Sequence, residues 1–220
     1  PEWCAVLPRV WRDRDEPALR TLLERARALG FTGVLIGNLG HLPLVRGLNF
    51  HLYGDYGLNV FNSRSLAYLK DKELESACVS FELRFAQIRD LKKVLRAEAI
   101  VYGRLPLMIT ENCLVQNETG CRLDRQGPCV PEDGPCRCGQ PNVLVDRTGA
   151  AFPLLPAYGH RTEIQNSKPL YLADRPEHRR LGLAYARLRF TTETAEECVS
   201  VVQNYLDAAP AAGDFTRGLY

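Results

Sequence analysis

Gly33-Val34-Leu35-Ile36-Gly37-Asn38 is the stretch that decides the fold class of this chain. It is a continuous apolar run, which is typical of a strand that is covered on both faces, as in a parallel sheet. Before it, apolar residues recur at helical spacing from Glu16-Pro17 and end at Gly30, which predicts an amphipathic helix. The apolar positions of that helix are Leu19, Leu22, Leu23, Ala26 and Leu29. A helix next to a buried strand is the repeating unit of an α/β fold.

The same unit recurs on both sides of this run. Further strands are expected at residues 5–10, 51–55, 77–82, 99–103 and 183–190, and helices at residues 41–48, 65–69, 85–95 and 192–209. Strands that alternate with helices predict a parallel sheet. Because a full barrel has eight strands and this pattern supplies six, we expect a partial TIM-like (β/α) barrel. The remaining part of the same protein, or a partner subunit, is expected to complete it.

Polar residues stand at the carboxyl ends of the expected strands. They are Arg9, Asn38, Asp55, Glu82 and Arg104. In a barrel these ends converge on the face that carries active sites. Any one of them is equally well explained as a helix cap or as half of a loop ion pair, but five together favour a site.

Composition excludes several classes of protein. With 220 residues and 45% hydrophobic content the chain can bury a core. A formal charge of +2 gives no bulk electrostatic footprint for nucleic acid, so any contact with RNA must be local. No apolar run approaches the roughly 20 residues that span a bilayer, and Pro1-Glu2-Trp3-Cys4 is unlike a signal peptide. We therefore expect a cytoplasmic protein with no membrane partner.

The regular pattern stops after Asn112, where glycines and prolines interrupt every periodic run. Three segments of one structural domain are expected: barrel residues 1–112, a cysteine-rich module at residues 113–172, and a final strand and helix at residues 173–220. Within the module, residues 142–154 predict a hairpin that turns at Arg147-Thr148-Gly149, and residues 160–164 predict a further strand. We expect the whole to belong to a longer protein.

Five of the eight cysteines stand in this module. They are Cys113, Cys121, Cys129, Cys136 and Cys138. Because cytosolic thiols are kept reduced, a metal explains such a group better than disulfides do. No C-x-x-C knuckle of the zinc-ribbon kind occurs, whereas an iron–sulfur cluster accepts looser spacing, with four thiolates or three thiolates and a nitrogen such as that of His160. Structural zinc, disulfides and unliganded cysteines remain alternatives at this point.

Several motifs resemble the collagenase-like peptidases of family U32, especially the long-form members, and they occur in the same order. They are Gly54-Asp55-Tyr56-Gly57-Leu58-Asn59-Val60-Phe61-Asn62-Ser63, Tyr102-Gly103-Arg104-Leu105-Pro106-Leu107-Met108, Gly120-Cys121, Asn166-Ser167-Lys168-Pro169-Leu170 and Asp214-Phe215-Thr216-Arg217-Gly218. The likeness covers nearly the whole chain. It implies a barrel protein of a family historically described as peptidases, with relatives that hydroxylate RNA bases or the ubiquinone ring without molecular oxygen.

The resemblance also implies a 4Fe-4S cluster, which those relatives hold with four cysteines. Cys113, Cys121 and Cys138 match three of the ligands, with Cys129 or Cys136 as alternates. His160 stands where long-form relatives carry a cysteine, and it is the expected fourth ligand. Zinc is the alternative metal.

The prediction that follows is an iron–sulfur-dependent hydroxylase that modifies ribosomal or transfer RNA, with RNA or a small molecule as its substrate. Asp55 and Glu82 are candidate acid–base residues. Arg104 and Lys168 are candidates for holding an anionic group, and Asn166 for orienting the substrate or the oxygen donor. Further substrate contacts are expected from Asn38, Asn59 and Arg161.

Two alternatives remain. The first is a peptidase, as the family is historically described. Neither His-Glu-x-x-His nor Gly-x-Ser-x-Gly occurs, so its nucleophile would be a cysteine paired with His160. The second is a non-catalytic docking half of a larger enzyme that keeps a metal-stapled loop for folding alone.

Overall fold

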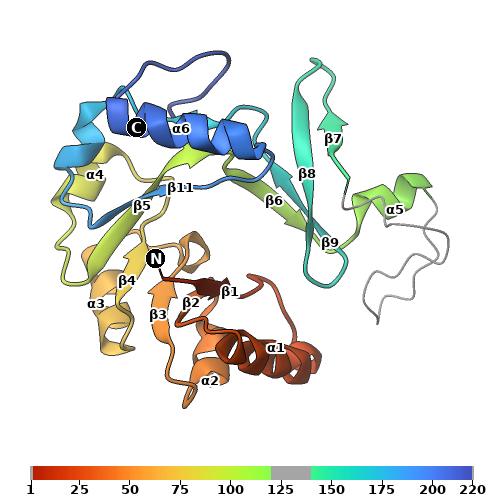
Figure 1. Ribbon diagram of the computed structural model, residues 1–220, viewed down its shortest axis with the longest axis vertical. Helices are drawn as coiled ribbons and strands as arrows, with labels where there is room; N and C mark the ends of the chain where they lie inside the picture. The colour runs from red at the N-terminus through yellow and green to blue at the C-terminus, as the bar shows by residue number, and fades with distance from the viewer. Residues whose placement is uncertain (1, 120–139, 220) are drawn as a thin grey trace. The chain divides into compact units, whose positions relative to one another are not determined.

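The computed structural model describes residues 2–119 and 140–219, and their contacts divide them into two compact units. Unit 1 holds the residues before Tyr102, then Arg175–Leu188 and the residues from Arg217 onward. Unit 2 holds the described residues of Tyr102–Asp174 together with Arg189–Thr216. Unit 1 is therefore discontinuous in sequence, and Figure 1 labels the α-helices and most of the strands of both.

Unit 1 is built on a parallel sheet. Strands β1 (Cys4–Val6), β2 (Gly33–Ile36), β3 (His51–Gly54), β4 (Ser76–Cys78) and β5 (Arg96–Gly103) pair in chain order, each parallel to the next. Strand β11 (Tyr185–Leu188) pairs with β5. It runs in the same direction, because Ala184 N donates to Ala97 O and Arg189 N donates to Tyr102 O. These six parallel strands form a curled half-barrel and confirm the expected partial TIM-like fold.

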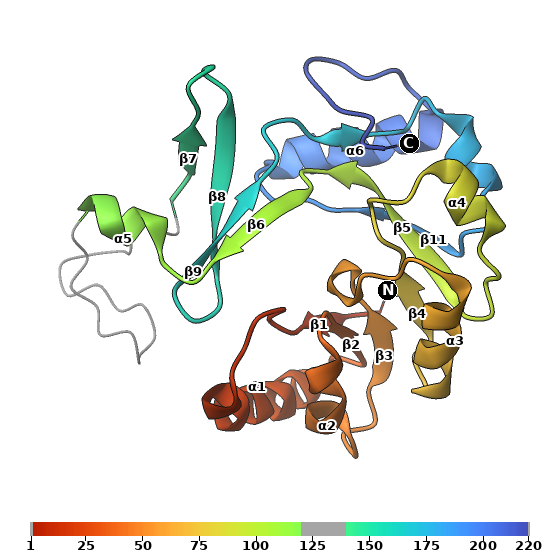
Figure 2. The same cartoon turned by 180° about the vertical axis from the view of Figure 1, so that it is seen from behind.

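Helices cover the outer side of this sheet. The α-helices of unit 1 are α1 (Glu16–Ala28), α2 (Leu42–Val45), α3 (Ser63–Asp71) and α4 (Phe85–Asp90), with 3₁₀ turns η1 (Asp13–Asp15), η2 (Leu39–His41), η3 (Tyr56–Leu58) and η5 (Pro176–Arg180). Figures 1 and 2 show α1, α2 and α3 along the same side of β1–β4. Leu19 and Leu23 of α1 and Val34 and Ile36 of β2 are all at most 1% exposed, so the predicted helical stripe and strand do form the core.

The inner face of the sheet is polar. Strand register makes Tyr53, Ser76 and Arg96 direct neighbours, and it pairs Cys78 with Glu98. A complete barrel fills this face with packed branched apolar side chains. The inner face of unit 1 therefore carries polar and ionisable groups where such barrels carry a hydrocarbon core.

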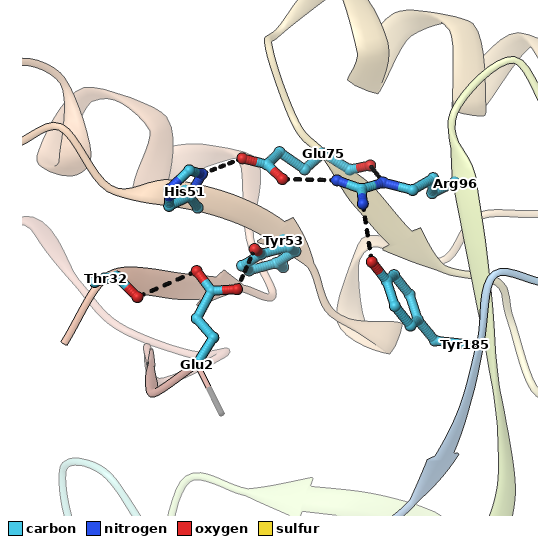
Figure 3. Close-up of polar contacts among 7 residues, drawn as sticks. All are labelled: Glu2, Thr32, His51, Tyr53, Glu75, Arg96 and Tyr185. Carbon is cyan, nitrogen blue, oxygen red and sulfur yellow. Dashed lines mark hydrogen bonds and ion pairs between the residues drawn. The ribbon is translucent and has the colours of Figure 1, made fainter.

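A polar network joins the amino-terminal ends of four strands (Figure 3). Glu75, just before β4, contacts both His51 of β3 and Arg96 of β5, with Arg96 Nη2 lying 2.7 Å from Glu75 Oε2. Arg96 Nη1 also donates to Tyr185 Oη of β11 at 3.0 Å. Glu2 accepts hydrogen bonds from two further residues beside it, Thr32 and Tyr53. Side chains at this end of barrel strands serve stability, and here they tie neighbouring strands together.

Unit 2 contains a four-stranded antiparallel sheet in the order β6 (Pro106–Thr110), β9 (Arg161–Gln165), β8 (Ala151–Ala157) and β7 (Asn142–Val145). The predicted hairpin is confirmed by the β7–β8 pair, whose turn is closed by Asp146 Oδ1 accepting from Thr148 N and Ala150 N. The further strand is confirmed as β9. Strand β6 was not predicted, because Pro106 and a register shift between Pro106 and Met108 break the alternation that marks a strand.

The rest of unit 2 surrounds Tyr102, the first of its residues on β5. The short strand β10 (Leu170–Tyr171) pairs antiparallel with Tyr102 and Gly103. The rings of Tyr171, Tyr205 and Phe190 lie 5.5–6.4 Å from that of Tyr102, centre to centre. Helices α5 (Leu114–Thr119) and α6 (Ala195–Asp207) complete the unit. Across residues 2–119 and 140–219, no helix has the length and apolar character that crossing a membrane requires.

Candidate functional site

The carboxyl end of the unit 1 sheet brings together three charged residues from three strands. Asp55 directly follows β3, Glu98 lies within β5 and Arg187 within β11. Arg187 Nη1 donates to Asp55 Oδ1 at 2.5 Å, and Arg187 Nε forms an ion pair with Glu98 Oε1. All three side chains are at most 17% exposed. The structure thus adds Arg187 and Glu98 to the predicted Asp55.

Burial controls the protonation of this group. Removal from water raises the pKa of Glu98, and the charge of nearby Asp55 acts in the same direction, while Arg187 opposes both. Burial also raises the pKa of the neighbouring Cys78 thiol, which keeps that group neutral. Burial and the charge of Asp55 thus both favour the neutral form of the Glu98 carboxyl.

The loops at this end of the sheet approach one another closely. A Cβ atom added to Gly57 would lie 2.6 Å from Gly37 O and 2.7 Å from Arg9 Cδ, so only glycine fits there. The ends of β1, β2 and β3 thus meet, as the strand-end pattern predicted. Asn38 takes part as a cap: its side chain accepts from Gly40 N at 2.8 Å and donates to Arg9 O at 3.3 Å.

The other two predicted residues of unit 1, Asn59 and Glu82, form backbone hydrogen bonds with residues that are near them in the sequence. Asn59 adopts a left-handed conformation with φ 53° and ends η3. Glu82 is exposed, and its backbone N donates to Ser80 Oγ at 3.3 Å. Neither of them is part of the Asp55, Glu98 and Arg187 group, and their predicted roles remain predictions.

In unit 2, three predicted residues come together. Arg104 follows β5, and its Nη1 donates to the carbonyl oxygens of Asn166 and Ser167, the first at 3.0 Å. Asn166 N donates to Leu105 O at 2.8 Å, and Asn166 Oδ1 accepts from Lys168 N at 3.2 Å. Lys168 is exposed, and its ammonium lies 3.7 Å from Asp214. The Nη1 group of Arg104 therefore fixes the loop that carries Asn166 and Lys168.

A second arginine, Arg189, was not predicted as a site residue from the sequence. It hydrogen-bonds to the backbone of Arg104. Arg189 Nη1 donates to Arg104 O at 2.7 Å and to Gln165 Oε1 at 2.6 Å, while its Nη2 donates to Glu163 Oε1 at 2.8 Å. Arg189 comes just after β11, so the same strand-end rule that singled out Arg104 would have found it. Glu163 and Gln165 carry no such sequence signal, because alternate polar residues are ordinary in a strand.

Arg161 is engaged within the protein. It is 4% exposed, and its guanidinium bonds to both carboxylate oxygens of Glu111, at 3.2 and 3.0 Å, and to Tyr158 O at 3.1 Å. This bidentate pair, in which the Arg161 side chain is buried and the Glu111 side chain is 59% exposed, ties the end of β6 to the start of β9. The predicted substrate contact of Arg161 stays a prediction.

The pairing of β6 with β9 brings Cys113 and His160 to the same end of the second sheet. Thr110 pairs with Thr162, so that Cys113, after β6, and His160, before β9, both lie beyond this last pair. Leu114 N donates to Thr162 Oγ1 at 3.0 Å, which holds the residue after Cys113 against β9. Both side chains are half-buried, and His160 is left-handed with φ 58°.

The remaining predicted ligands, Cys121, Cys129, Cys136 and Cys138, lie outside the described residues. Within the described ranges, no cluster of three or more His, Cys, Asp or Glu side chains is arranged to hold a metal ion. The chain re-enters the sheet at Asn142, which pairs with Leu154 of β8 and begins β7 from the end where Ala157 pairs with Arg161. This is the end that carries Cys113 and His160.

Comparisons with known proteins give one match. Residues 3–143 match the family model described as Peptidase family U32. No curated protein and no solved structure matches the chain.

Proposed function

Because the chain belongs to peptidase family U32, we propose that it is an iron–sulfur-dependent hydroxylase that acts on an RNA base without molecular oxygen. The observation that supports this most is the position of Cys113 and His160 at one end of the β6–β9 pair, where the cysteine-rich segment begins and ends. The likeness of the sequence motifs to hydroxylating relatives supplies the reaction.

Cys113, Cys121, Cys138 and His160 would hold a 4Fe-4S cluster, with Cys129 or Cys136 as alternates and zinc as the alternative metal. Such a cluster supplies electron transfer. One neutral imidazole among three thiolates leaves the site less negative than four thiolates do, which raises its reduction potential.

The chain's own residues would bind and orient the substrate. Arg104 has Nε and Nη2 left after its two carbonyl bonds, and these suit a phosphate or carboxylate oxygen. Lys168, exposed beside it, suits a second anionic oxygen. Asn166 has its backbone N fixed by Leu105 O, and its side-chain amide suits hydrogen bonds to a base or donor.

Metal analysis after anaerobic purification tests the cofactor. The full protein should contain iron and acid-labile sulfide, and Cys113→Ser and His160→Ala should lower both. Cys198→Ser is the matched control, because Cys198 is a half-buried cysteine of unit 2 on α6, away from the β6–β9 end. Zinc, or no metal, in the unmodified protein would overturn the cluster.

Nucleoside mass spectrometry tests the reaction. RNA from cells that carry the intact gene should contain a nucleoside heavier by one oxygen atom that is missing when the gene carries Cys113→Ser. Anaerobic growth should leave this nucleoside present. Identical nucleoside profiles with the intact and altered gene would contradict the proposed activity.

A cysteine peptidase is the second candidate, since a thiol and an imidazole lie at the same end of the β6–β9 pair. Iodoacetamide treatment of metal-free protein distinguishes the two. A peptidase would cleave denatured collagen or casein in this state and lose the activity on alkylation. The hydroxylase is expected to cleave neither substrate before or after treatment.

A further inference from the structure

Three side chains that end in flat groups meet at the carboxyl end of the unit 1 sheet. Arg9 comes after β1, Tyr56 begins η3 just after β3, and Phe81 comes after β4. The Cζ atom of Arg9 lies over the Tyr56 ring, 5.4 Å from its centre. The rings of Tyr56 and Phe81 lie 5.9 Å apart, centre to centre, with 52° between their planes. All three residues are half-buried, so each keeps part of its surface in contact with solvent.

The turn that carries Tyr56 is fixed by its own backbone and by a close contact with Arg9. Asn59 N donates to Tyr56 O at 3.0 Å, which closes the turn. A Cβ atom at Gly57 would lie 2.7 Å from Arg9 Cδ. Glycine at this position therefore lets the stem of Arg9 lie against the turn, with its guanidinium over the Tyr56 ring.

The backbone on either side of Phe81 is anchored as well. Ser80 N donates to Val60 O at 3.0 Å, and Leu83 N donates to Ser80 O at 3.2 Å. The Tyr56 and Phe81 rings are thus carried by two turns with fixed backbones. Binding to such a preformed surface costs less conformational entropy than binding to a segment that must first become ordered.

A guanidinium and two aromatic rings in this arrangement suit a flat, unsaturated ligand. Nucleobases stack through their faces on aromatic rings and on arginine planes. The guanidinium over the Tyr56 ring adds a cation–π contact within the same group. The formal charge of the chain is only +2, which gives no general attraction for phosphates, so local contacts with a base must supply much of the affinity for RNA.

We propose that Arg9, Tyr56 and Phe81 form a stacking platform for one unpaired RNA base. The inference deepens the proposed function, on which it rests, by naming the residues that receive the base and by limiting the substrate to single-stranded RNA. Bases within a duplex are covered by their neighbours on both faces and must leave the stack before they reach such a platform. Asp55, a candidate acid–base residue whose carboxylate accepts from Arg187, directly precedes Tyr56 in the chain.

Fluorescence of an RNA that contains one 2-aminopurine tests the platform without any turnover. In a single strand of uridines, which stack weakly on it, 2-aminopurine is bright, and stacking on the full protein should quench it. Tyr56→Leu and Phe81→Leu should each weaken binding by at least about 5-fold, as loss of one base–aromatic stack does. Tyr68→Leu is the matched control, because Tyr68 is 47% exposed on α3 and has Lys72 Nζ 5.2 Å from its ring centre. It should bind as the unmodified protein does.

Two further variants separate stacking from charge and from folding. Arg9→Lys keeps the positive charge but loses the guanidinium plane, so it should also weaken binding. Tyr56→Phe keeps the ring and should restore the affinity that Tyr56→Leu loses. Circular dichroism reports the fold of each variant, and if Tyr56→Leu is unfolded, Phe81→Leu and Arg9→Lys carry the test.

The platform is refuted if the folded variants at Arg9, Tyr56 and Phe81 bind the single strand as tightly as Tyr68→Leu does. Annealing the probe to its complement should lower its affinity by at least about 10-fold, because pairing and stacking energy must then be spent to expose the base. A duplex that binds as tightly as the single strand would equally overturn the proposal.

Nucleoside mass spectrometry separates failure of the platform from failure of the proposed function. Cells that carry Tyr56→Leu should lose most of the modified nucleoside, although the purified variant retains its iron. Quenching through the platform by a protein whose gene leaves no modified nucleoside in RNA would refute the hydroxylase alone. An unchanged level of the modified nucleoside with Tyr56→Leu would refute the platform alone.

Discussion

At two single residues, Gly103 and His41, a small chemical change is expected to lower the stability of the protein. Gly103 has φ 114°, and a Cβ atom there would lie 2.0 Å from the backbone oxygen of Arg189. That contact matters because the same Arg189 bonds to Arg104 O, so the close crossing sets the position of a proposed substrate-binding arginine. His41 is the other extreme: an imidazole fully removed from solvent, stacked on Trp11.

Gly103→Ala should destabilise unit 2 by more than about 3 kcal/mol, because the methyl group strikes a backbone atom and the left-handed conformation adds about 1–2 kcal/mol. Gly30→Ala is the control, since Gly30 has φ 87° but open space around its Cβ position. Gly30→Ala should lower the free energy of unfolding only by the conformational contribution of about 1–2 kcal/mol. Urea unfolding measures both, and equal losses would show that the crossing at Gly103 is loose.

His41 should make the protein sensitive to acid. Burial lowers its pKa from 6.5 to about 4, while Nε2 is hydrogen-bonded to Pro8 O and Nδ1 has no partner. Between pH 6.5 and about 4, His41 is therefore protonated in the unfolded state but not in the folded state. Stability is fully present above about pH 6.5 and falls by up to about 3 kcal/mol as the pH approaches 4.

Unfolding followed by the fluorescence of Trp11, which stacks on His41, measures this effect. His41→Gln keeps a donor for Pro8 O and cannot be protonated, so its stability should change less between pH 6.5 and 4. An acid slope equal to that of the unmodified protein would assign the sensitivity to other groups.

At the scale of elements, the sequence predicts a turn or a helix start where the residues that form it are close together in the chain. The turn at Asp146 to Gly149 closes through its own side chain, and α6 begins at a threonine followed three residues later by glutamate, which is the capping-box pattern. Strand β6 escaped prediction because its support comes from β9, about fifty residues along the chain. Pairing with a strand so far along the chain produces no recognisable sequence pattern within β6.

Thr194→Ala should weaken α6 by about 1 kcal/mol, because Thr194 Oγ1 accepts from Glu197 N and Glu197 reaches back to Thr194 N. Thr192→Ala is the matched control, because Thr192 lies exposed outside the helix. Thermal unfolding should separate the two variants. Equal effects would mean that the cap contributes nothing to α6.

At the scale of the molecule, the barrel class followed from periodicity, while the ionic group on the inner face did not. Glu98 lies between Ala97 and Ala99 in an apolar strand, and a charge in such a place is a signal of a buried partner. The sequence does not say which partner. Arg187 is supplied by a strand that follows the whole of the cysteine-rich module, and only the β5–β11 pairing identifies it.

Metal removal should act on one unit and spare the other. Cys113 and His160 both belong to unit 2, so loss of the proposed cluster should speed hydrogen exchange in β6 and β9. Exchange in β2 and β3 of unit 1 should stay unchanged. Mass spectrometry of peptides before and after chelation measures both, and equal acceleration throughout would show that the metal supports the entire chain.

The return of β11 to β5 has a consequence for the order of assembly during synthesis. The first five strands emerge from the ribosome together, but their sixth neighbour is made only after more than eighty further residues. Until then the part of the β5 edge before Tyr102, where β10 pairs, is exposed to other nascent chains, and closing so long a loop costs entropy before its contacts form. Slow translation between β5 and β11 should therefore lengthen the period in which a chaperone is needed.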